Sequence, residues 1–256
     1  MSAFDQRPLA GKTALVTGGS MNLGAVTART LAAQGAMVAI NHLPHEKEPT
    51  ALLEELRSCG RPAYAVPGDL AIGSEVKAVV EKAMELLGGR IDILINNAGP
   101  FNADPFTQLS EAEWDRIMNV NVKAIYLATQ GVVPGMRAAG WGRIINMAAG
   151  SAFIRNHGVY GLAKGAVILL TEALALELGP QITVNAIAPG QIAESAPDIS
   201  AIDPTFVERA IKHTPSGRLV TRQEVANLIA WLCSPAADQI TGHTIPIDGG
   251  WRFNRF

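Results

Sequence analysis

The sequence predicts an α/β fold in which helices cover both faces of one parallel sheet. Short apolar runs alternate with amphipathic stretches of helical period along the chain. Regular alternation of strands and helices requires crossover connections, and these produce parallel strands with helices on both sides. Runs such as Ile91–Ile95 are apolar almost throughout, which is typical of a strand buried on both faces. Together these patterns predict a doubly wound sheet.

The expected strands are distributed over the whole chain. They are Thr13–Thr17, Met37–Ile40, Ala63–Val66, Ile91–Ile95, Arg143–Met147, Thr183–Ile187 and His243–Ile247. Helical periodicity is clearest in Ala25–Gln34, Glu75–Leu87, Ala112–Met136 and Tyr160–Leu178. No Ser/Pro-rich linker, low-complexity tract or internal repeat interrupts the alternation. We therefore expect a single domain that comprises residues 1–256.

One segment departs from this rhythm. Residues 191–215 contain Pro197, Pro204 and Pro215 and mix polar with apolar residues. A long connection of this kind in a compact domain is often an active-site lid. We expect an insertion over the sheet that covers the substrate.

The composition argues against several classes of protein. The chain has 48% hydrophobic and 17% charged residues, and its formal net charge of −2 gives no electrostatic reason to expect nucleic acid or an anionic membrane as partner. Neither the two cysteines, Cys59 and Cys233, nor the histidines have metal-ligand spacing. The N-terminus lacks a signal-peptide profile, and no apolar run reaches the roughly 18 residues of a membrane span. We expect a cytoplasmic protein without a metal site.

A glycine-rich turn follows the first expected strand. The strand leads into Thr17-Gly-Gly-Ser-Met-Asn-Leu-Gly24, and a helix is expected next. Glycines in this context let the backbone approach a pyrophosphate, whose charge then lies at the helix N-terminus. The turn therefore predicts a Rossmann-type dinucleotide site. Asp69, after the third expected strand, is a candidate acceptor for the adenine amino group, or alternatively the cap of the following helix.

Tyr160 and Lys164 are four residues apart on an expected helix. At this spacing the two side chains share one helix face. A tyrosine phenol has an unperturbed pKa of about 10, and a nearby ammonium lowers that pKa toward the working range. The pair therefore predicts a proton-transfer site, although the same spacing also occurs on solvated helix faces.

Six motifs in order resemble those of the short-chain dehydrogenase/reductase family, over nearly the whole chain. The family turn T-G-x-x-x-G-x-G appears as Thr17–Gly24, with Asn22 at the middle glycine. Asparagine is among the few residues that tolerate a left-handed backbone, so the turn can survive this change. The other five motifs are Asn96-Asn-Ala-Gly99, Asn121 within Asn119-Val-Asn-Val122, Tyr160-x-x-x-Lys164, Pro189-Gly-Gln-Ile192, and Thr241-Gly242 with Asp248-Gly-Gly250.

The resemblance implies an NAD(P)-dependent enzyme that interconverts a ketone and an alcohol. Tyr160 would protonate the carbonyl oxygen as hydride arrives, and Lys164 would lower the pKa of Tyr160 and hold the nicotinamide ribose. Asn121 would support a water in the proton relay. Hydride addition builds an alkoxide, which independently favours a positioned proton donor. The residues expected to contact the cofactor are Thr17, Gly18, Ser20, Asn22, Leu23, Gly24, Asn41, His42, Asp69, Leu70, Asn97, Ala98, Gly99, Tyr160, Lys164, Pro189, Gly190 and Ile192.

One position departs from the family pattern. Family members place a serine three residues after the position of Asn146, where this chain has Ala149, and the interval from there to Tyr160 is two residues shorter than usual. Ser151 is a candidate to supply the missing hydroxyl; the alternative is that Ser151 is only a loop residue. Loss of one oxyanion donor costs about 10²–10³ in rate. We therefore expect an active but atypical reductase.

NADP(H) is favoured over NAD(H). An acidic residue at the end of the second strand would bond the ribose 2′-hydroxyl and select NAD. This strand ends at Asn41-His42 without a carboxylate, and His42, His45 and Lys47 can face a 2′-phosphate. Against this, Met21 stands where many NADP-using relatives carry a basic residue, and Glu46 and Glu48 dilute the positive charge.

The expected substrate is a small, largely apolar carbonyl compound or the matching alcohol. The residues expected to line its pocket are Pro100, Phe101, Phe153, Ile154 and the segment 191–215. The apolar helix Tyr160–Leu178 and the aromatic tail 251–256 predict burial in a partner subunit, and with the resemblance they predict a homotetramer. A second function stays open, because Asn22 and Ala149 also fit a nucleotide-binding regulatory or scaffold subunit with attenuated catalysis.

Overall fold

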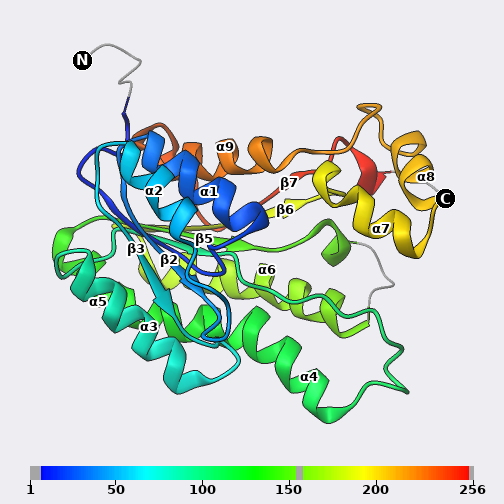
Figure 1. Cartoon of the computed structure of the whole chain (residues 1–256), viewed down its shortest axis with the longest axis horizontal. Coiled ribbons are helices and arrows are strands. Elements are labelled where there is room, and N and C mark those ends of the chain that lie inside the picture. Colours follow the sequence, from blue (N-terminus) through cyan, green and yellow to red (C-terminus); the bar gives the residue numbers. More distant parts are fainter. Residues whose placement is uncertain (1–6, 154–157, 254–256) are drawn as a thin grey trace.

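The strands form one parallel sheet with helices on both faces (Figure 1) in the computed structural model, which describes residues 7–153 and 158–253. Within these residues the sheet has seven strands in the order β3-β2-β1-β4-β5-β6-β7, and every neighbouring pair is parallel. The predicted doubly wound α/β fold is confirmed. The strands are β1 Thr13–Val16, β2 Met37–His42, β3 Ala63–Pro67, β4 Ile93–Asn96, β5 Gly142–Met147, β6 Ile182–Pro189 and β7 Thr244–Ile247.

Helices pack on the sheet from above and below. Figure 1 shows α1, α2 and α9 over one face and α3, α5 and α6 over the other. The helices are α1 Asn22–Ala33, α2 Thr50–Ser58, α3 Gly73–Leu86, α4 Glu111–Met118, α5 Ala124–Ala139, α6 Gly158–Leu178, α7 Ala196–Ile202, α8 Phe206–Lys212 and α9 Arg222–Cys233. The shorter turns are a π-helical turn at Asn119–Lys123 and 3-10 turns at Gly150–Phe153, Ala193–Ser195, Pro235–Ala237 and Trp251–Phe253.

Local sequence explains where several helices begin and end. The Ser110 side chain accepts the Glu113 N–H at the start of α4, and Thr221 with Glu224 forms a capping box at the start of α9. Gly140, with φ 66°, ends α5 in the left-handed conformation that glycine adopts at low cost. The stretch predicted as one periodic helix, Ala112–Met136, is instead α4 and α5 separated by the π-helical turn.

Two apolar layers hold the sheet between its helices. In β1, Ala14 and Val16 pack into the layer under α1 and α9, whereas Leu15 packs into the layer over α3 and α5. Alternate residues of a strand face opposite sides of a sheet, so a strand buried on both sides must be apolar throughout. This requirement explains the uninterrupted apolar runs of the sequence.

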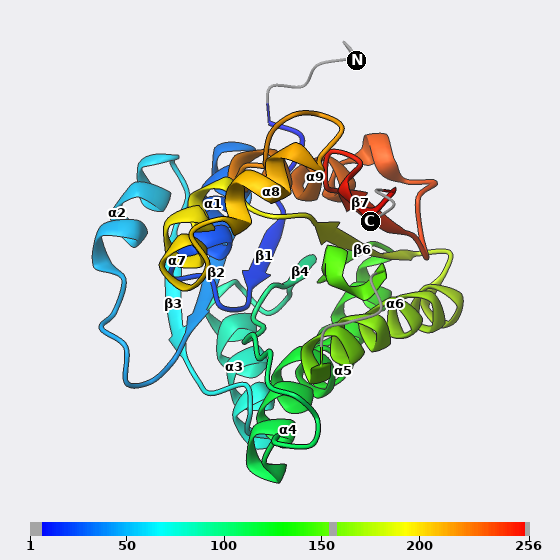
Figure 2. The same ribbon diagram turned by 90° about the vertical axis from the view of Figure 1, so that its right-hand side faces the viewer.

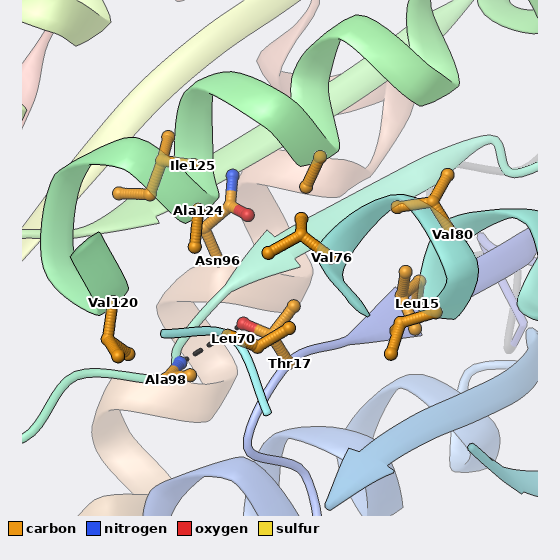
Figure 3. Close-up of a pocket in the computed structure, with 12 residues that line it drawn as sticks. Leu15, Thr17, Leu70, Val76, Val80, Asn96, Ala98, Val120, Ala124 and Ile125 are labelled. Carbon is orange, nitrogen blue, oxygen red and sulfur yellow. Dashed lines mark hydrogen bonds between the residues drawn. The ribbon is translucent and has the colours of Figure 1, made fainter. Parts of the chain in front are cut away.

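The strand order reverses between β1 and β4, where ligands bind in doubly wound sheets. Thr17 joins the two strand ends, because its Oγ1 accepts the N–H groups of Asn97 at 2.9 Å and Ala98 at 3.1 Å. Figure 3 shows the bond to Ala98 beside a small, mostly apolar cavity of about 10 Å³. That volume is no larger than one water molecule needs, so this cavity is a packing defect of the core rather than a ligand site.

The segment 191–215 is more regular than its composition indicates. Ile192 pairs with Val220 in an isolated parallel bridge, and α7 and α8 follow. Pro197 is the second residue of α7, where a missing N–H costs no intrahelical bond. Figures 1 and 2 show α7 and α8 beyond one end of the sheet on the side of α1 and α9, with α4 on the other side. The segment is therefore largely helical, and its role as an insertion that covers the substrate stays a prediction.

Among the described residues, α6 is the one helix long and apolar enough to cross a membrane, although the sequence predicted no such span. Core helices pass the same test of length and composition. This helix packs against β5 and β6, and Val167 and Leu174 are buried there. Its outer face carries Leu162, Leu169 and Leu176, which remain exposed.

Candidate active site

Two cavities gather most of the predicted site residues. The glycine-turn cavity, of about 670 Å³, is lined by Gly18, Ser20, Asn22, Leu23, Gly24, Asn41, His42, Asp69, Leu70, Asn97, Ala98 and Gly99, together with Met21, Leu43, His45, Glu46, Gly68, Ala71, Pro100, Arg116 and Val120. The Tyr160 cavity, of about 570 Å³, is lined by Ser151, Tyr160, Pro189, Gly190 and Ile192, together with Phe101, Ala149, Gly150, Gln191, Ser195, Asp203, Phe206 and Trp251. Thr17, Asn121 and Lys164 line neither of the two cavities.

The glycine turn leaves no room for a side chain at Gly18 or at Gly24. A Cβ on Gly24 would lie 2.1 Å from the carbonyl oxygen of Gly18, and a Cβ on Gly18 would lie 3.1 Å from Cα of Ala98. Asn22 has φ 49°, which confirms the prediction that asparagine occupies the left-handed position there. A close-packed backbone at the N-terminus of a twelve-residue helix fits the pyrophosphate of a dinucleotide.

Asn41 and Asn97 support this turn with their side chains. Asn41 Oδ1 accepts the Gly18 N–H at 3.2 Å, and its Nδ2 donates to the Gly68 carbonyl at 3.0 Å. Asn97 Nδ2 donates to the carbonyls of Thr17 and Gly18, both at 3.0 Å. Asn41 therefore shapes the turn, and because it also lines the glycine-turn cavity, its predicted contact with the cofactor stays a prediction.

Asp69 does not cap the helix that follows it. Its Oδ1 accepts the Ala71 N–H at 2.9 Å in a local turn, and α3 begins later, after Ile72. The alternative prediction, that Asp69 caps the following helix, is therefore wrong. The carboxylate lines the glycine-turn cavity, and its contact with adenine stays a prediction.

Asn121 and Lys164 direct polar atoms toward Gly99. Asn121 Nδ2 donates to the carbonyls of Pro100 at 3.1 Å and Ile117 at 3.0 Å, while its buried Oδ1 has no partner among the described residues. A Cβ on Gly99 would lie 2.5 Å from Asn121 Oδ1 and 3.0 Å from Lys164 Nζ. Three motifs far apart in the sequence thus converge on one small space.

We expect the substitution Gly99→Ala to lower kcat by about 10- to 100-fold, because the added methyl group would displace Asn121 Oδ1 and Lys164 Nζ; a loss of that size corresponds to about 1.4–2.7 kcal/mol in the activation barrier. Both nearby atoms are the ends of side chains, so they can move aside while the fold survives. The control is Gly165→Ala on α6, whose added Cβ would meet nothing within 4 Å. Steady-state kinetics and thermal melting of both variants check this; equal kcat values for the two variants would contradict the expected role of the space beside Gly99.

Burial sets the pKa values of Tyr160 and Lys164. Loss of hydration raises the pKa of the Tyr160 phenol to about 12 and lowers the pKa of the Lys164 ammonium to about 7. Lys164 Nζ donates to the Met147 carbonyl at 2.7 Å, and it lies 5.5 Å from the centroid of the Tyr160 ring. Burial is thus the cause of the raised pKa of Tyr160, and the expected lowering of that pKa by Lys164 stays a prediction.

Ser151 has a buried hydroxyl without a hydrogen-bond partner among the described residues. It lies in the 3-10 turn Gly150–Phe153 and lines the Tyr160 cavity beside Ala149. A buried hydroxyl without a partner costs free energy, so such a group in a pocket is a candidate for binding or catalysis. The Phe101 ring, which also lines this cavity, contacts the Tyr160 ring edge-on, with centroids 5.0 Å apart.

The substrate side of the site differs from the prediction in several residues. Phe101 lines the Tyr160 cavity as predicted, whereas Phe153 does not line it and Ile154 lies outside the described residues. Trp251 also lines this cavity, which the sequence did not predict, and the expected burial of the tail in a partner subunit stays a prediction. Sequence reasoning also missed Arg116 in the glycine-turn cavity. No local signal marks Trp251 or Arg116, because only the fold brings them to these cavities.

Comparisons with known proteins agree with this geometry. A model of the family described as enoyl-(acyl carrier protein) reductase matches residues 19–252. The chain is 34% identical over 242 residues to the 3-oxoacyl-[acyl-carrier-protein] reductase FabG of Staphylococcus aureus, covering 93% of this chain and 97% of the relative. It also resembles the crystal structure of a putative short-chain alcohol dehydrogenase from Sinorhizobium meliloti, with a TM-score of 0.90, 33% identity, and coverage of 96% and 98% of the two chains. A gluconate 5-dehydrogenase from Burkholderia cenocepacia, solved with NADP and tartrate, matches with a TM-score of 0.90, 31% identity, and coverage of 99% and 100%.

Proposed function

The chain belongs to the short-chain dehydrogenase/reductase family and is an NAD(P)-dependent oxidoreductase, and from this premise we propose that it reduces the ketone of a small, largely apolar substrate or oxidises the matching alcohol. The observation that carries the proposal is the Tyr160 cavity. In it a phenol, the Ser151 hydroxyl, which has no partner among the described residues, and the segment Pro189–Ile192 surround one space. These are the groups that a ketone oxygen and a nicotinamide ring require.

Each residue has one task in the proposed reaction. The cofactor, when bound, supplies hydride to the carbonyl carbon. Tyr160 donates its phenolic proton to the carbonyl oxygen, which otherwise would carry a full negative charge. Lys164 Nζ donates a proton toward Tyr160 through a water whose hydrogen bond Asn121 Oδ1 accepts, since both atoms lie beside Gly99. Alcohol oxidation uses the same groups in the reverse order.

Ser151 supplies the hydroxyl that Ala149 lacks. Its Oγ donates to the substrate oxygen, so Ser151→Ala is expected to lower kcat/KM by about tenfold or more through the loss of one oxyanion donor. Ser195→Ala is the matched control, because Ser195 lines the same cavity. Kinetics of both variants against wild type check this; an unchanged rate in Ser151→Ala leaves Ser151 as a loop residue.

NADP(H) is the preferred cofactor in this proposal. The gluconate 5-dehydrogenase that resembles this chain was solved with NADP. The strand β2 ends without a carboxylate, and His42 and His45 line the glycine-turn cavity. Lys47, also predicted to face the 2′-phosphate, does not line that cavity, so the two histidines are the basic groups left from the predicted set.

The helices α7 and α8 form the substrate lid, and a second copy of the chain covers the outer face of α6. Asp203 and Phe206 of the segment 191–215 line the Tyr160 cavity, which supports the lid. The side chains of Leu169 and Leu176 are 68% and 89% exposed, which is costly for leucines that no partner covers. This face supports the expected homotetramer, and the enzyme is proposed to be cytoplasmic.

Oxidation of NADPH across a panel of ketones tests the proposed activity. Turnover of apolar ketones by wild type, together with its loss in Tyr160→Phe, supports a reductase. Tight cofactor binding without turnover of any ketone or alcohol supports the alternative, a regulatory or scaffold subunit. Absence of cofactor binding contradicts both.

A further inference from the structure

The Glu46 carboxylate lines the glycine-turn cavity, although β2 itself ends without a carboxylate. Glu46 lies in the connection between β2 and α2, and its N–H donates to the Leu43 carbonyl at 3.0 Å, which turns the chain back. Ser20 Oγ donates to Glu46 Oε2 at 3.3 Å. This bond joins the connection to the glycine turn across 26 residues of sequence, and it holds the carboxylate inside the glycine-turn cavity.

The neighbourhood of Glu46 matches the place where dinucleotides differ. In doubly wound nucleotide folds, an acidic residue about 20 positions after the glycine turn bonds the adenosine ribose 2′-hydroxyl, and the 2′-phosphate of NADP occupies the same place. Glu46 follows the last glycine of the turn, Gly24, by a similar interval. It lines one cavity with His42 and His45, at the carboxyl end of β2.

The charges that surround this place are opposed. His42 and His45 can donate to phosphate oxygens, and the His42 Nδ1 is already held by the Leu43 carbonyl at 3.0 Å. Arg116 and Asp69 also line the cavity, and Arg116 is paired with Glu113 at 2.6 Å. A half-buried carboxylate repels a dianionic 2′-phosphate but accepts a hydrogen bond from a 2′-hydroxyl.

The geometry points to Glu46 as a selectivity residue that weakens NADP(H) binding and keeps the chain open to NAD(H). The inference rests on the proposed nucleotide site, but it needs no catalytic role for any residue. It gives the glycine-turn cavity two opposed elements, the histidines and Glu46, whose balance sets the preference for one cofactor. The preference for NADP(H) in wild type is therefore smaller than the histidines alone would produce.

Titration of each cofactor into the full chain, followed by nucleotide fluorescence or calorimetry, tests this without any substrate. In Glu46→Gln the Kd for NADPH is expected to fall about five- to tenfold, because a repulsive charge near the phosphate is removed. The Kd for NADH is expected to rise about two- to fivefold with the loss of a charged acceptor. The gain in NADPH affinity shrinks as salt screens the repulsion.

Two further variants separate this effect from a general disturbance. Glu48→Gln removes a neighbouring carboxylate that is exposed and does not line the cavity, so it is expected to leave both Kd values unchanged. Ser20→Ala frees the Glu46 side chain and is expected to shift the ratio of the two Kd values in the same direction as Glu46→Gln, but less. Thermal melting verifies that all three variants fold.

The ratio of the two Kd values decides the outcome. Equal changes for NADPH and NADH in Glu46→Gln, no change, or the same shift in Glu48→Gln overturn the role of Glu46 while the proposed oxidoreductase stands. Failure of wild type to bind either cofactor overturns the proposed function and this inference together.

Discussion

Replacement of Tyr160 by phenylalanine is expected to lower kcat by about 10²–10⁴-fold, the range for loss of a positioned general acid. The ring remains, so its edge contact with Phe101 and the packing of the Tyr160 cavity are retained. Only the proton donor disappears. The carbonyl carbon then receives hydride while the carbonyl oxygen receives no matched proton, which leaves the developing alkoxide unstabilised.

Single-turnover oxidation of the bound reduced cofactor measures this loss directly. The matched control is Tyr126→Phe, since Tyr126 is exposed on α5 and its hydroxyl bonds only Gln130 among the described residues. Cofactor affinity and melting temperature are expected to match wild type in both variants. A Tyr160→Phe enzyme with more than about a tenth of wild-type kcat would show that another group provides the proton.

Replacement of Lys164 by methionine is expected to stabilise the protein while it removes activity. Burial lowers the pKa of Lys164 from 10.5 to about 7, so the folded protein resists the charged form. Between these two pH values the unfolded chain binds a proton that the native protein does not hold. The stability of wild type therefore rises with pH from about 7 to 10.5 on account of this group.

Methionine fills a similar volume without a charge and abolishes this contribution to the pH dependence. At pH 7 we expect Lys164→Met to gain about 1–3 kcal/mol in the free energy of unfolding, after the loss of the bond to Met147. Urea denaturation at pH 7 and pH 9.5 measures both quantities. Lys123→Met, at an exposed lysine of the π-helical turn, is the control. A less stable Lys164→Met with the wild-type pH dependence would contradict the assigned burial penalty.

The two substitutions together distinguish a functional pair from a structural one. A buried lysine with a lowered pKa costs stability, and active sites commonly retain such groups at that cost. Loss of activity in both variants, with stability unchanged in one and increased in the other, is the result that a proton-transfer role requires.

The sheet and the motifs were predictable because their causes are local. Alternating apolar runs determine the strands, and residues of β1 are buried in the layers on both of its faces. The glycine turn requires a left-handed residue at Asn22, and the sequence shows a residue that accepts it. The spacing of Tyr160 and Lys164 places both on one helix, α6. None of these inferences needs a contact between distant parts of the chain.

Other features depend on contacts that the sequence pattern does not contain. Asn41 bonds the glycine turn, Glu46 reaches the turn through Ser20, and Trp251 reaches the Tyr160 cavity from the end of the chain. Each of these placements joins elements that are separated by tens of residues or more. Propensity and periodicity report only on neighbours a few residues apart, so they cannot assign such partners.

The pKa values of the central pair show the same division most clearly. The sequence by itself determined which two groups share a helix face, and from that alone a charged lysine would lower the pKa of the phenol. Only the tertiary structure decided the direction in which the pKa of Tyr160 shifts, because burial of the phenol raises that pKa to about 12. The same packing holds Lys164 against the Met147 carbonyl. Hydration is a property of the whole packed protein, whereas spacing is a property of the helix.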